Sequence, residues 1–192
     1  MINADDALTI YNLLAAQDIL VWLSGGWGID ALLGEQTRPH KDLDVIMLLD
    51  DVHPLFNLLA VHGYNLKELW SENLWVIDSD QNKVPTAFVL HDSAGWELDA
   101  HAMRLDEAGN GIPSWAEAGD FILSKYDLST AGIIAGTTVR CISPEMQLRA
   151  HLGYTLPGYQ RQDLLRLHEK FGTSFPQGFS LFQPPEIENS SE

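Results

Sequence analysis

The chain has 192 residues, a length typical of one domain, and 45% of them are hydrophobic, which is enough to build a buried core. Its 27 acidic and 11 basic side chains give a formal net charge of −16, which argues against a general nucleic-acid binder because such proteins need a basic surface. A single cysteine, no apolar run of transmembrane length and no visible signal peptide argue against a disulfide framework, a cysteine-rich zinc site and a membrane protein, so we expect a cytoplasmic protein.

The first predicted elements are a helix and a short strand. Residues 4–18 place apolar side chains at helical spacing, and two acidic residues near the helix start complement its dipole. We assign this helix to packing alone. Residues 20–23 follow as a short apolar strand, which leads directly into the most informative part of the chain.

A glycine turn follows this strand. Ser24, Gly25 and Gly26 lead into a short helix over residues 27–33, which Gly34 ends. The two glycines allow a tight turn and a close approach of the backbone. The helix behind them presents free N–H groups and the positive end of its dipole, so the turn is suited to bind a phosphate. Plain turn chemistry is the alternative interpretation of the same residues.

Two aspartates lie at the start of the next strand. After a polar loop over residues 35–41, Asp42 and Asp44 precede the apolar run 45–49. Side chains two apart in a strand point to the same face, so both carboxylates are directed at one place, where burial increases their repulsion. A divalent cation relieves that repulsion, and Mg²⁺ combines a few carboxylates with water and substrate phosphates. Beside an anion-binding turn, the pair predicts a nucleoside-triphosphate site.

The residues around this pair have less certain roles. If the strand starts early, Arg38 and His40 share the face of the two aspartates. His40 then either contacts the triphosphate, positions Asp42 or only pins the loop, and the sequence leaves these alternatives open. Asp30 can orient the loop from the preceding helix, although an exposed helical aspartate is the interpretation that we favour.

The middle of the chain is predicted to extend the sheet. Asp50 and Asp51 can cap a helix over residues 52–62 that ends at Gly63. A polar, glycine-containing stretch over residues 104–114 is typical of a hairpin loop. Six segments have strand character, and several of the first four are expected to form a meander: 64–70, 75–78, 86–91, 96–101, 115–124 and 137–141.

Three motifs, in this order and spacing, resemble a known family. They are Gly-Gly-Trp-Gly-x-Asp in residues 25–30, Arg-x-His-x-Asp-x-Asp in residues 38–44 and Leu-Asp-x-His in residues 98–101. The chain resembles the lincosamide and aminoglycoside nucleotidyltransferases, the antibiotic-modifying branch of the superfamily that shares a fold with DNA polymerase β. The resemblance covers roughly residues 4–171 and implies an α+β fold: a polymerase-β-like mixed sheet with flanking helices and a short C-terminal helical segment.

The resemblance also implies the roles of several residues. Asp99 corresponds to a third carboxylate on a strand next to that of Asp42 and Asp44, where it serves as a metal ligand, as the general base for the acceptor hydroxyl, or as both. The three carboxylates are thus the expected catalytic residues and the ligands of Mg²⁺, which we expect as two ions. His101 lies two residues beyond Asp99 and faces the same way, so it either touches the substrate or is a plain surface histidine.

The nucleotide is expected to contact residues from both the N-terminal and the C-terminal part of the chain. The family resemblance places a basic side chain of the C-terminal helices on the nucleotide phosphates, and Arg161 is the candidate in this chain. Arg38 and Lys41 are the other nearby cations that can offset the acidic total. The expected nucleotide-binding residues are therefore Ser24, Gly25, Gly26, Arg38, His40 and Arg161.

The C-terminal region begins with a strong helix signal. Ser143, followed by proline and glutamate, predicts a helix to about Tyr154, and residues 159–171 form a last helix that ends at Gly172. We predict three parts: a nucleotidyltransferase catalytic domain over residues 1–142, a C-terminal helical segment over residues 143–172 and a flexible tail over residues 173–192.

The predicted function is Mg²⁺-dependent transfer of a nucleoside monophosphate from an NTP to a hydroxyl of a lincosamide or an aminoglycoside. The negative charge suits a small cationic acceptor, although solubility alone also explains it. A toxin–antitoxin component of the same fold, or a transferase acting on another metabolite or a macromolecule, is the alternative. A degenerate binder is disfavoured because adjacent carboxylates are costly to keep. The short chain further suggests a homodimer in which a second subunit completes the acceptor pocket.

Overall fold

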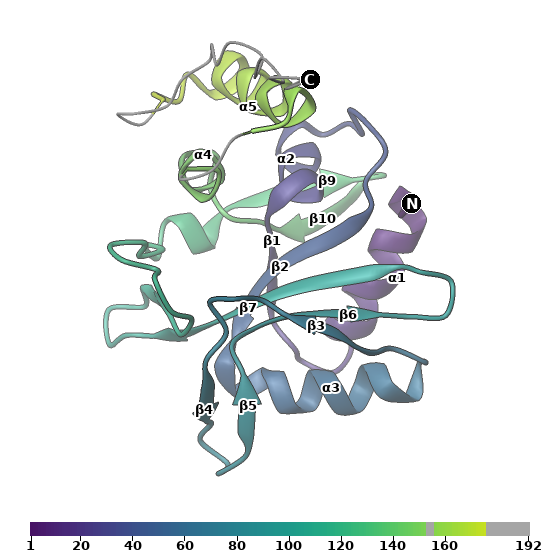
Figure 1. Ribbon diagram of the computed structural model, residues 1–192. Helices are drawn as coiled ribbons and strands as arrows, with labels where there is room; N and C mark the ends of the chain where they lie inside the picture. Colours follow the sequence, from purple (N-terminus) through teal and green to yellow (C-terminus); the bar gives the residue numbers. More distant parts are fainter. Residues whose placement is uncertain (153–155, 176–192) are drawn as a thin grey trace, which may run out of the picture.

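The computed structural model describes residues 1–152 and 156–175, so residues 176–192 of the predicted tail lie outside it (Figure 1). A mixed sheet forms its centre. In spatial order the strands are β1 (Val21–Leu23), β2 (Asp42–Leu48), β7 (Glu97–Leu105), β6 (Ala87–His91) and β3 (Asn65–Leu69), and β8 (Gly111–Pro113) also pairs with β7. Only β2 and β7 are parallel, while the other pairs are antiparallel. The predicted mixed α+β fold is confirmed.

The predicted meander is confirmed in part. Strands β3, β6 and β7 are antiparallel neighbours, as expected. The segment near residue 75 instead leaves the sheet as β4 (Trp75–Ile77), which pairs with β5 (Lys83–Pro85) in a separate hairpin. A second hairpin, β9 (Ala131–Ile134) with β10 (Thr137–Arg140), confirms the last predicted strand and adds one that the sequence pattern did not reveal.

The strand predicted over residues 115–124 is wrong. This stretch consists of turns, with a single bridge that joins Leu123 to Gly111. Glu117 and Gly119 adopt positive φ angles of 60° and 55°, and such left-handed residues interrupt an extended strand. The apolar side chains that suggested a strand instead include Trp115 and Phe121, which line the pocket described below.

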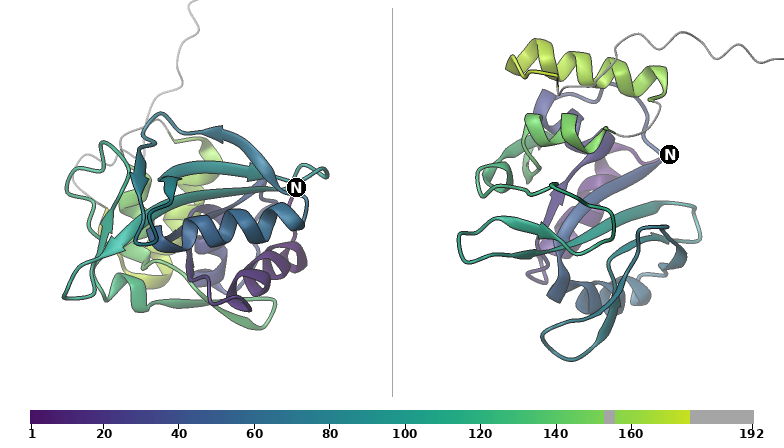
Figure 2. Two further views of the ribbon diagram at one scale, coloured as in Figure 1. Left: turned by 90° about the horizontal axis from the view of Figure 1, so that it is seen from below. Right: turned by 60° about the vertical axis from the view of Figure 1, so that its left-hand side comes forward.

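Helices lie on both sides of the sheet. Seen from below in Figure 2, α3 (Val52–Val61) lies in front of the strands, whereas α4 (Pro144–Ala150) and α5 (Gly158–Phe171) lie behind them. The buried residues of α1 (Ala4–Ala15) and α3 join one core with alternate residues of the central strands. These strand residues are Leu43, Val45, Met47, Leu98, Ala100 and Ala102. The intervening residues of β2 and β7 therefore face the other way, toward α4 and α5.

Three predicted helix boundaries are confirmed, whereas α1 ends at Ala15 and not at residue 18. Gly34 ends α2 (Gly25–Leu33) and Gly172 ends α5, both in the left-handed conformation, and the Ser143 hydroxyl accepts the Met146 N–H at the start of α4. The predicted end of α4 at Tyr154 differs from the structure, in which α4 ends at Ala150, and Tyr154 itself lies outside the described residues.

The predicted capping of α3 is wrong. A 3₁₀ turn over Leu49–Asp51 precedes the helix, so Asp51 has helical backbone angles and its side chain caps no N–H of α3. The Asp51 carboxylate accepts the Leu20 N–H at 3.2 Å, and Asp50 accepts the Ser79 N–H at 3.0 Å. Both aspartates thus connect separate segments of the chain instead of capping the N-terminus of α3. No helix of the described part is long and apolar enough to cross a membrane.

Candidate active site

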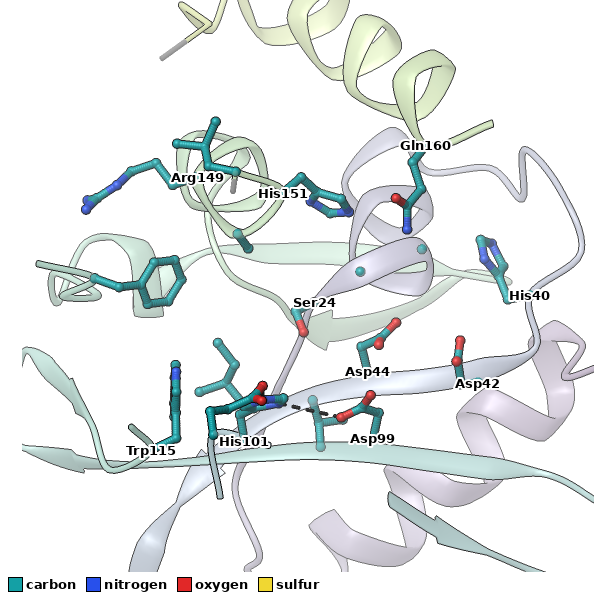
Figure 3. A pocket seen from close by; sticks show the side chains of 18 of the residues that line it. Ser24, His40, Asp42, Asp44, Asp99, His101, Trp115, Arg149, His151 and Gln160 are labelled. Carbon is teal, nitrogen blue, oxygen red and sulfur yellow. Dashed lines mark hydrogen bonds and ion pairs between the residues drawn. The ribbon is translucent and has the colours of Figure 1, made fainter. Parts of the chain in front are cut away.

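Three carboxylates meet where β2 and β7 run in parallel. The register places Asp44 beside Asp99, and Asp42 lies one alternation earlier on the same face of β2. All three line a pocket of about 630 Å³ between the sheet and the C-terminal helices, and Figure 3 shows them on the sheet side of it. The structure therefore brings together the three residues that were predicted to be catalytic.

The pocket raises the pKa of two of these carboxyl groups. Burial and the neighbouring Asp99 raise the pKa of Asp42, while Lys41 acts in the opposite direction. Burial, followed by the charges of Asp42 and Asp99, raises the pKa of Asp44 well above its usual range. The ionised cluster is therefore unfavourable without a counter-charge, which makes it suited to bind a cation.

The donor set fits magnesium held together with a substrate. No group of three or more His, Cys, Asp or Glu side chains in the described part is arranged to hold a metal ion by itself. Mg²⁺ does not require such a cage, because it usually keeps several waters and binds through one or two carboxylates plus substrate phosphates. The oxygen ligands of Asp42, Asp44 and Asp99, open to the same pocket, meet that requirement.

The glycine turn lies directly against the carboxylates. Gly25 has a φ of 55°, and a Cβ on it would lie 2.0 Å from Asp44 Oδ2. The Ser24 N–H donates to the Asp44 carbonyl at 2.9 Å, which ties the turn to β2. Ser24 occupies the N-cap of α2 without a side-chain capping bond, so the first N–H groups of α2 are not capped by its hydroxyl. This end of the pocket can accept an anion.

His40 and Asp30 hold the loop between α2 and β2. His40 is only 2% exposed, and its Nε2 lies 2.5 Å from a carboxylate oxygen of Asp30. The other Asp30 oxygen accepts the Thr37 hydroxyl at 2.6 Å. Asp30 was predicted to be exposed, and this is wrong: it is 2% exposed, because the loop folds back over α2. His40 also borders the pocket, so its buried contact with Asp30 pins the loop beside the site.

We expect Asp30→Ala to destabilise the protein by about 3 kcal/mol, because the change leaves a buried histidine and a hydroxyl without their partner. Urea unfolding of the purified protein measures the effect. Glu35→Ala is the matched control, since Glu35 is an exposed carboxylate at the start of the same loop. Equal free energies of unfolding for the two variants would show that the buried network contributes nothing.

The predicted phosphate-binding cations divide into two groups. Arg38 and Lys41 line the pocket, although Lys41 also forms an ion pair with Glu97 at 2.9 Å. Arg161 lies on α5 but is not among the residues that line the pocket. Arg149, which no sequence pattern indicated, borders the pocket from α4 (Figure 3) and donates to the Asp120 carbonyl at 2.9 Å.

Comparison with known proteins places the chain in a family. The sequence profile of the aminoglycoside-2''-adenylyltransferases matches residues 6–167. The chain belongs to this family. Membership confirms the predicted resemblance and the predicted class of enzyme, a nucleotidyltransferase.

Individual members of the family show how the similarity is distributed. A lincosamide resistance protein of Staphylococcus haemolyticus is 28% identical over 159 residues, which cover 82% of this chain and 89% of the relative. A 2''-aminoglycoside nucleotidyltransferase of Escherichia coli is 30% identical over 139 residues, or 71% of this chain and 67% of the relative. The similar proteins therefore include one named for lincosamide resistance and one named for aminoglycosides.

Solved structures agree with the fold. The lincosamide antibiotic adenylyltransferase LnuA, solved with lincomycin bound, has a TM-score of 0.71 and 25% identity, and the match covers 86% of this chain and 96% of that one. ANT(2'')-Ia, in complex with adenylyl-2''-tobramycin, has a TM-score of 0.65 over 87% of this chain and 88% of that one, at 19% identity. The second likeness concerns the fold alone.

In this family member, Asp99 contacts His101, which the sequence places on the same face, and two further residues of this network were not predicted, Trp70 and Glu72. The indole N–H of Trp70 donates to Asp99 Oδ1 at 2.9 Å, and His101 Nδ1 lies 3.5 Å from the same oxygen. His101 Nε2 in turn lies 3.1 Å from a Glu72 oxygen. Burial lowers the pKa of His101, but its bonds to Asp99 and Glu72 outweigh this and raise it. Trp70 and Glu72 come from the β3–β4 connection, 29 residues from their partners, and no local motif announces them.

An aromatic wall bounds the pocket on the side of His101. The Trp115 ring meets His101 edge-on at 5.0 Å, and Phe121 lies 6.1 Å from Trp115. Glu72 and Glu117 line the pocket on this side as well. Apolar faces beside carboxylates suit a small organic molecule that carries a positive charge. The glycine turn and the aromatic wall thus provide two chemically different subsites on either side of the carboxylates.

Proposed function

We propose that the chain transfers a nucleoside monophosphate from an NTP to a hydroxyl of a small antibiotic, with a lincosamide as the first candidate acceptor. The carboxylate cluster between an anion-binding turn and an aromatic wall carries the proposal. The lincosamide candidate is supported by the extensive match to the staphylococcal lincosamide resistance protein and by the similarity to LnuA. Aminoglycosides are the second candidate, because Glu72 and Glu117 suit a polycationic acceptor.

In this proposal the two parts of the chain have different roles in the site. The predicted catalytic domain, residues 1–142, supplies the carboxylates and the glycine turn, and the helical segment from residue 143 covers the pocket with α4 and α5. The triphosphate binds at Ser24, Gly25 and Gly26, where the N-terminal end of α2 offers the positive end of its dipole. The acceptor binds against Trp115 on the opposite side.

The reaction is one in-line substitution. The acceptor oxygen attacks the α-phosphorus, a new P–O bond forms, and the bond to the departing pyrophosphate breaks. Asp99 accepts the hydroxyl proton, and Oδ2 is the oxygen we assign to this step because Oδ1 already accepts the Trp70 indole N–H. Asp42, Asp44 and Asp99 would hold Mg²⁺, as one or two ions, which when bound neutralises phosphate charge and stabilises the entering and leaving oxygens.

The chain's own residues contribute chiefly positioning. Trp70 and His101 fix the Asp99 carboxylate, and Glu72 fixes His101 from the far side. The turn at Gly25 sets the distance between the phosphates and β2. Holding both substrates in reactive geometry accounts for a large part of the acceleration in reactions of this kind.

A direct assay tests the proposal. Purified protein is incubated with Mg²⁺, each of the four NTPs, and panels of lincosamides and aminoglycosides, and pyrophosphate release is measured. Mass spectrometry then identifies the product. We expect acceptor-dependent release and an antibiotic whose mass has increased by one nucleoside monophosphate. The assignment of an antibiotic hydroxyl as acceptor would be refuted by pyrophosphate release that does not depend on an acceptor. It would also be refuted if no antibiotic in either panel caused release.

A further inference from the structure

Arg38 is held by the C-terminal helix and not only by its own loop. Its Nε donates to Asp163 Oδ2 on α5 at 2.8 Å, and the Asp163 side chain is only 3% exposed. The guanidinium also stacks on the Tyr159 ring, 4.6 Å from its centroid, at the start of the same helix. A charged hydrogen bond and an aromatic contact together fix a side chain that would otherwise occupy many rotamers.

The held guanidinium reaches the anion-binding turn. Arg38 lines the pocket, and its Nη2 would lie 3.0 Å from a Cβ placed on Gly26. Gly26 is in the first turn of α2, which offers the positive end of its dipole. Because Asp163 binds Nε and the Pro39 carbonyl accepts from Nη1 at 3.3 Å, Nη2 is the nitrogen placed toward this turn.

We infer that Asp163 and Tyr159 are positioning residues, which hold Arg38 against the α2 turn so that the two together bind the pyrophosphate part of the NTP. The inference rests on the proposed function and extends it, because it assigns α5 a part in nucleotide affinity through a residue on a distant loop. It also predicts a change in anion affinity opposite to the change expected from charge alone. Removing a carboxylate near an anion site ordinarily strengthens anion binding, whereas losing the Arg38 anchor weakens it.

Calorimetric titration of the full chain with magnesium pyrophosphate tests the sign. We expect Asp163→Ala to weaken binding about tenfold, the loss typical of one charged hydrogen bond in the site. Asp163→Asn keeps the side-chain shape and a neutral acceptor, so its loss is smaller but has the same direction. Glu169→Gln removes the same charge from an exposed position of α5 and is expected to change affinity by less than about twofold. Thermal melting verifies that each variant is folded.

Two further measurements separate positioning from a general structural role. In an Arg38→Ala background, Asp163→Ala is expected to cause no additional loss of pyrophosphate affinity, because its effect passes through Arg38. In the transfer assay the KM for the NTP rises in Asp163→Ala in proportion to the loss of pyrophosphate affinity, while the KM for the acceptor stays unchanged.

These measurements distinguish failure of the proposed function from failure of the positioning role of Asp163. A wild-type chain that neither binds pyrophosphate nor releases it would refute the proposed function and this inference with it. Normal binding by the wild type, lost in Arg38→Ala but kept or strengthened in Asp163→Ala, would refute the positioning role alone. An equal loss from Asp163→Ala in both backgrounds would likewise show that Asp163 does not act through Arg38.

Discussion

Asp44→Asn is expected to reduce nucleotidyl transfer by about a thousandfold or more while the fold remains intact. Asp44 lies beside Asp99 in the β2–β7 register and against the glycine turn. It therefore adjoins both the proposed general base and the proposed triphosphate-binding turn. An amide preserves the shape of the side chain but removes the charge that a cation requires. Pyrophosphate release with a competent acceptor measures the effect.

A matched variant separates this loss from a general effect of charge. Glu97 lies on the same face of β7, bound by Lys41 and Lys67, and is not among the residues that line the pocket. Glu97→Gln changes the net charge by the same amount and is expected to retain activity within about threefold. A similar rate for Asp44→Asn and Glu97→Gln would exclude Asp44 from the catalytic cluster.

Asp44→Asn should also be more stable than the wild type in the absence of metal. Because burial and two neighbouring carboxylates raise the pKa of Asp44, the folded chain binds more protons than the unfolded chain between the ordinary value of 3.8 and the raised one. The ionised carboxylate therefore costs stability above the raised pKa, and this cost disappears as the pH falls toward 3.8.

Thermal melting in a chelator across this pH range measures that cost. We expect Asp44→Asn to melt at a higher temperature than the wild type at neutral pH, with the difference narrowing as the pH falls. Added Mg²⁺ should stabilise the wild type more than the variant, since binding to the folded state alone raises the melting temperature. A difference that stays constant with pH would contradict the assigned ionisation.

The second large effect is expected from Gly25→Ala. A methyl group at this position would lie 2.0 Å from Asp44 Oδ2 and 2.5 Å from Asp44 Cγ, so either the carboxylate or the turn must move. A displacement of about 1 Å in a catalytic site commonly costs about a hundredfold in rate, and we expect a loss of that order. Transfer kinetics at saturating NTP measure it.

Gly34 provides the control for backbone strain. It also has a positive φ, 78°, but a Cβ on it would meet nothing within 4 Å. Gly34→Ala is therefore expected to lose about 1 kcal/mol of stability through the left-handed conformation and to keep its activity. If Gly25→Ala and Gly34→Ala were impaired equally, backbone strain and not the contact with Asp44 would explain the loss.

Sequence periodicity by itself predicted that two carboxylates of the pocket share one face of a strand. Alternation along a strand is a local property, so Asp42 and Asp44 could be placed on one face before any tertiary contact was known. The turn signals at Gly34 and Ser143 were equally local, and both are confirmed. The family motifs added Asp99, which the register then placed beside Asp44.

Only the tertiary structure decided which distant residues support that chemistry. Trp70 reaches Asp99 across 29 positions and Arg38 reaches Asp163 across 125, through strand order and helix packing that no local pattern contains. Asp30 was predicted to be exposed because its helical position allowed it, but the returning loop buries it. The physical reason is the same in each case: side-chain periodicity specifies a face, whereas what covers that face depends on how the whole chain folds.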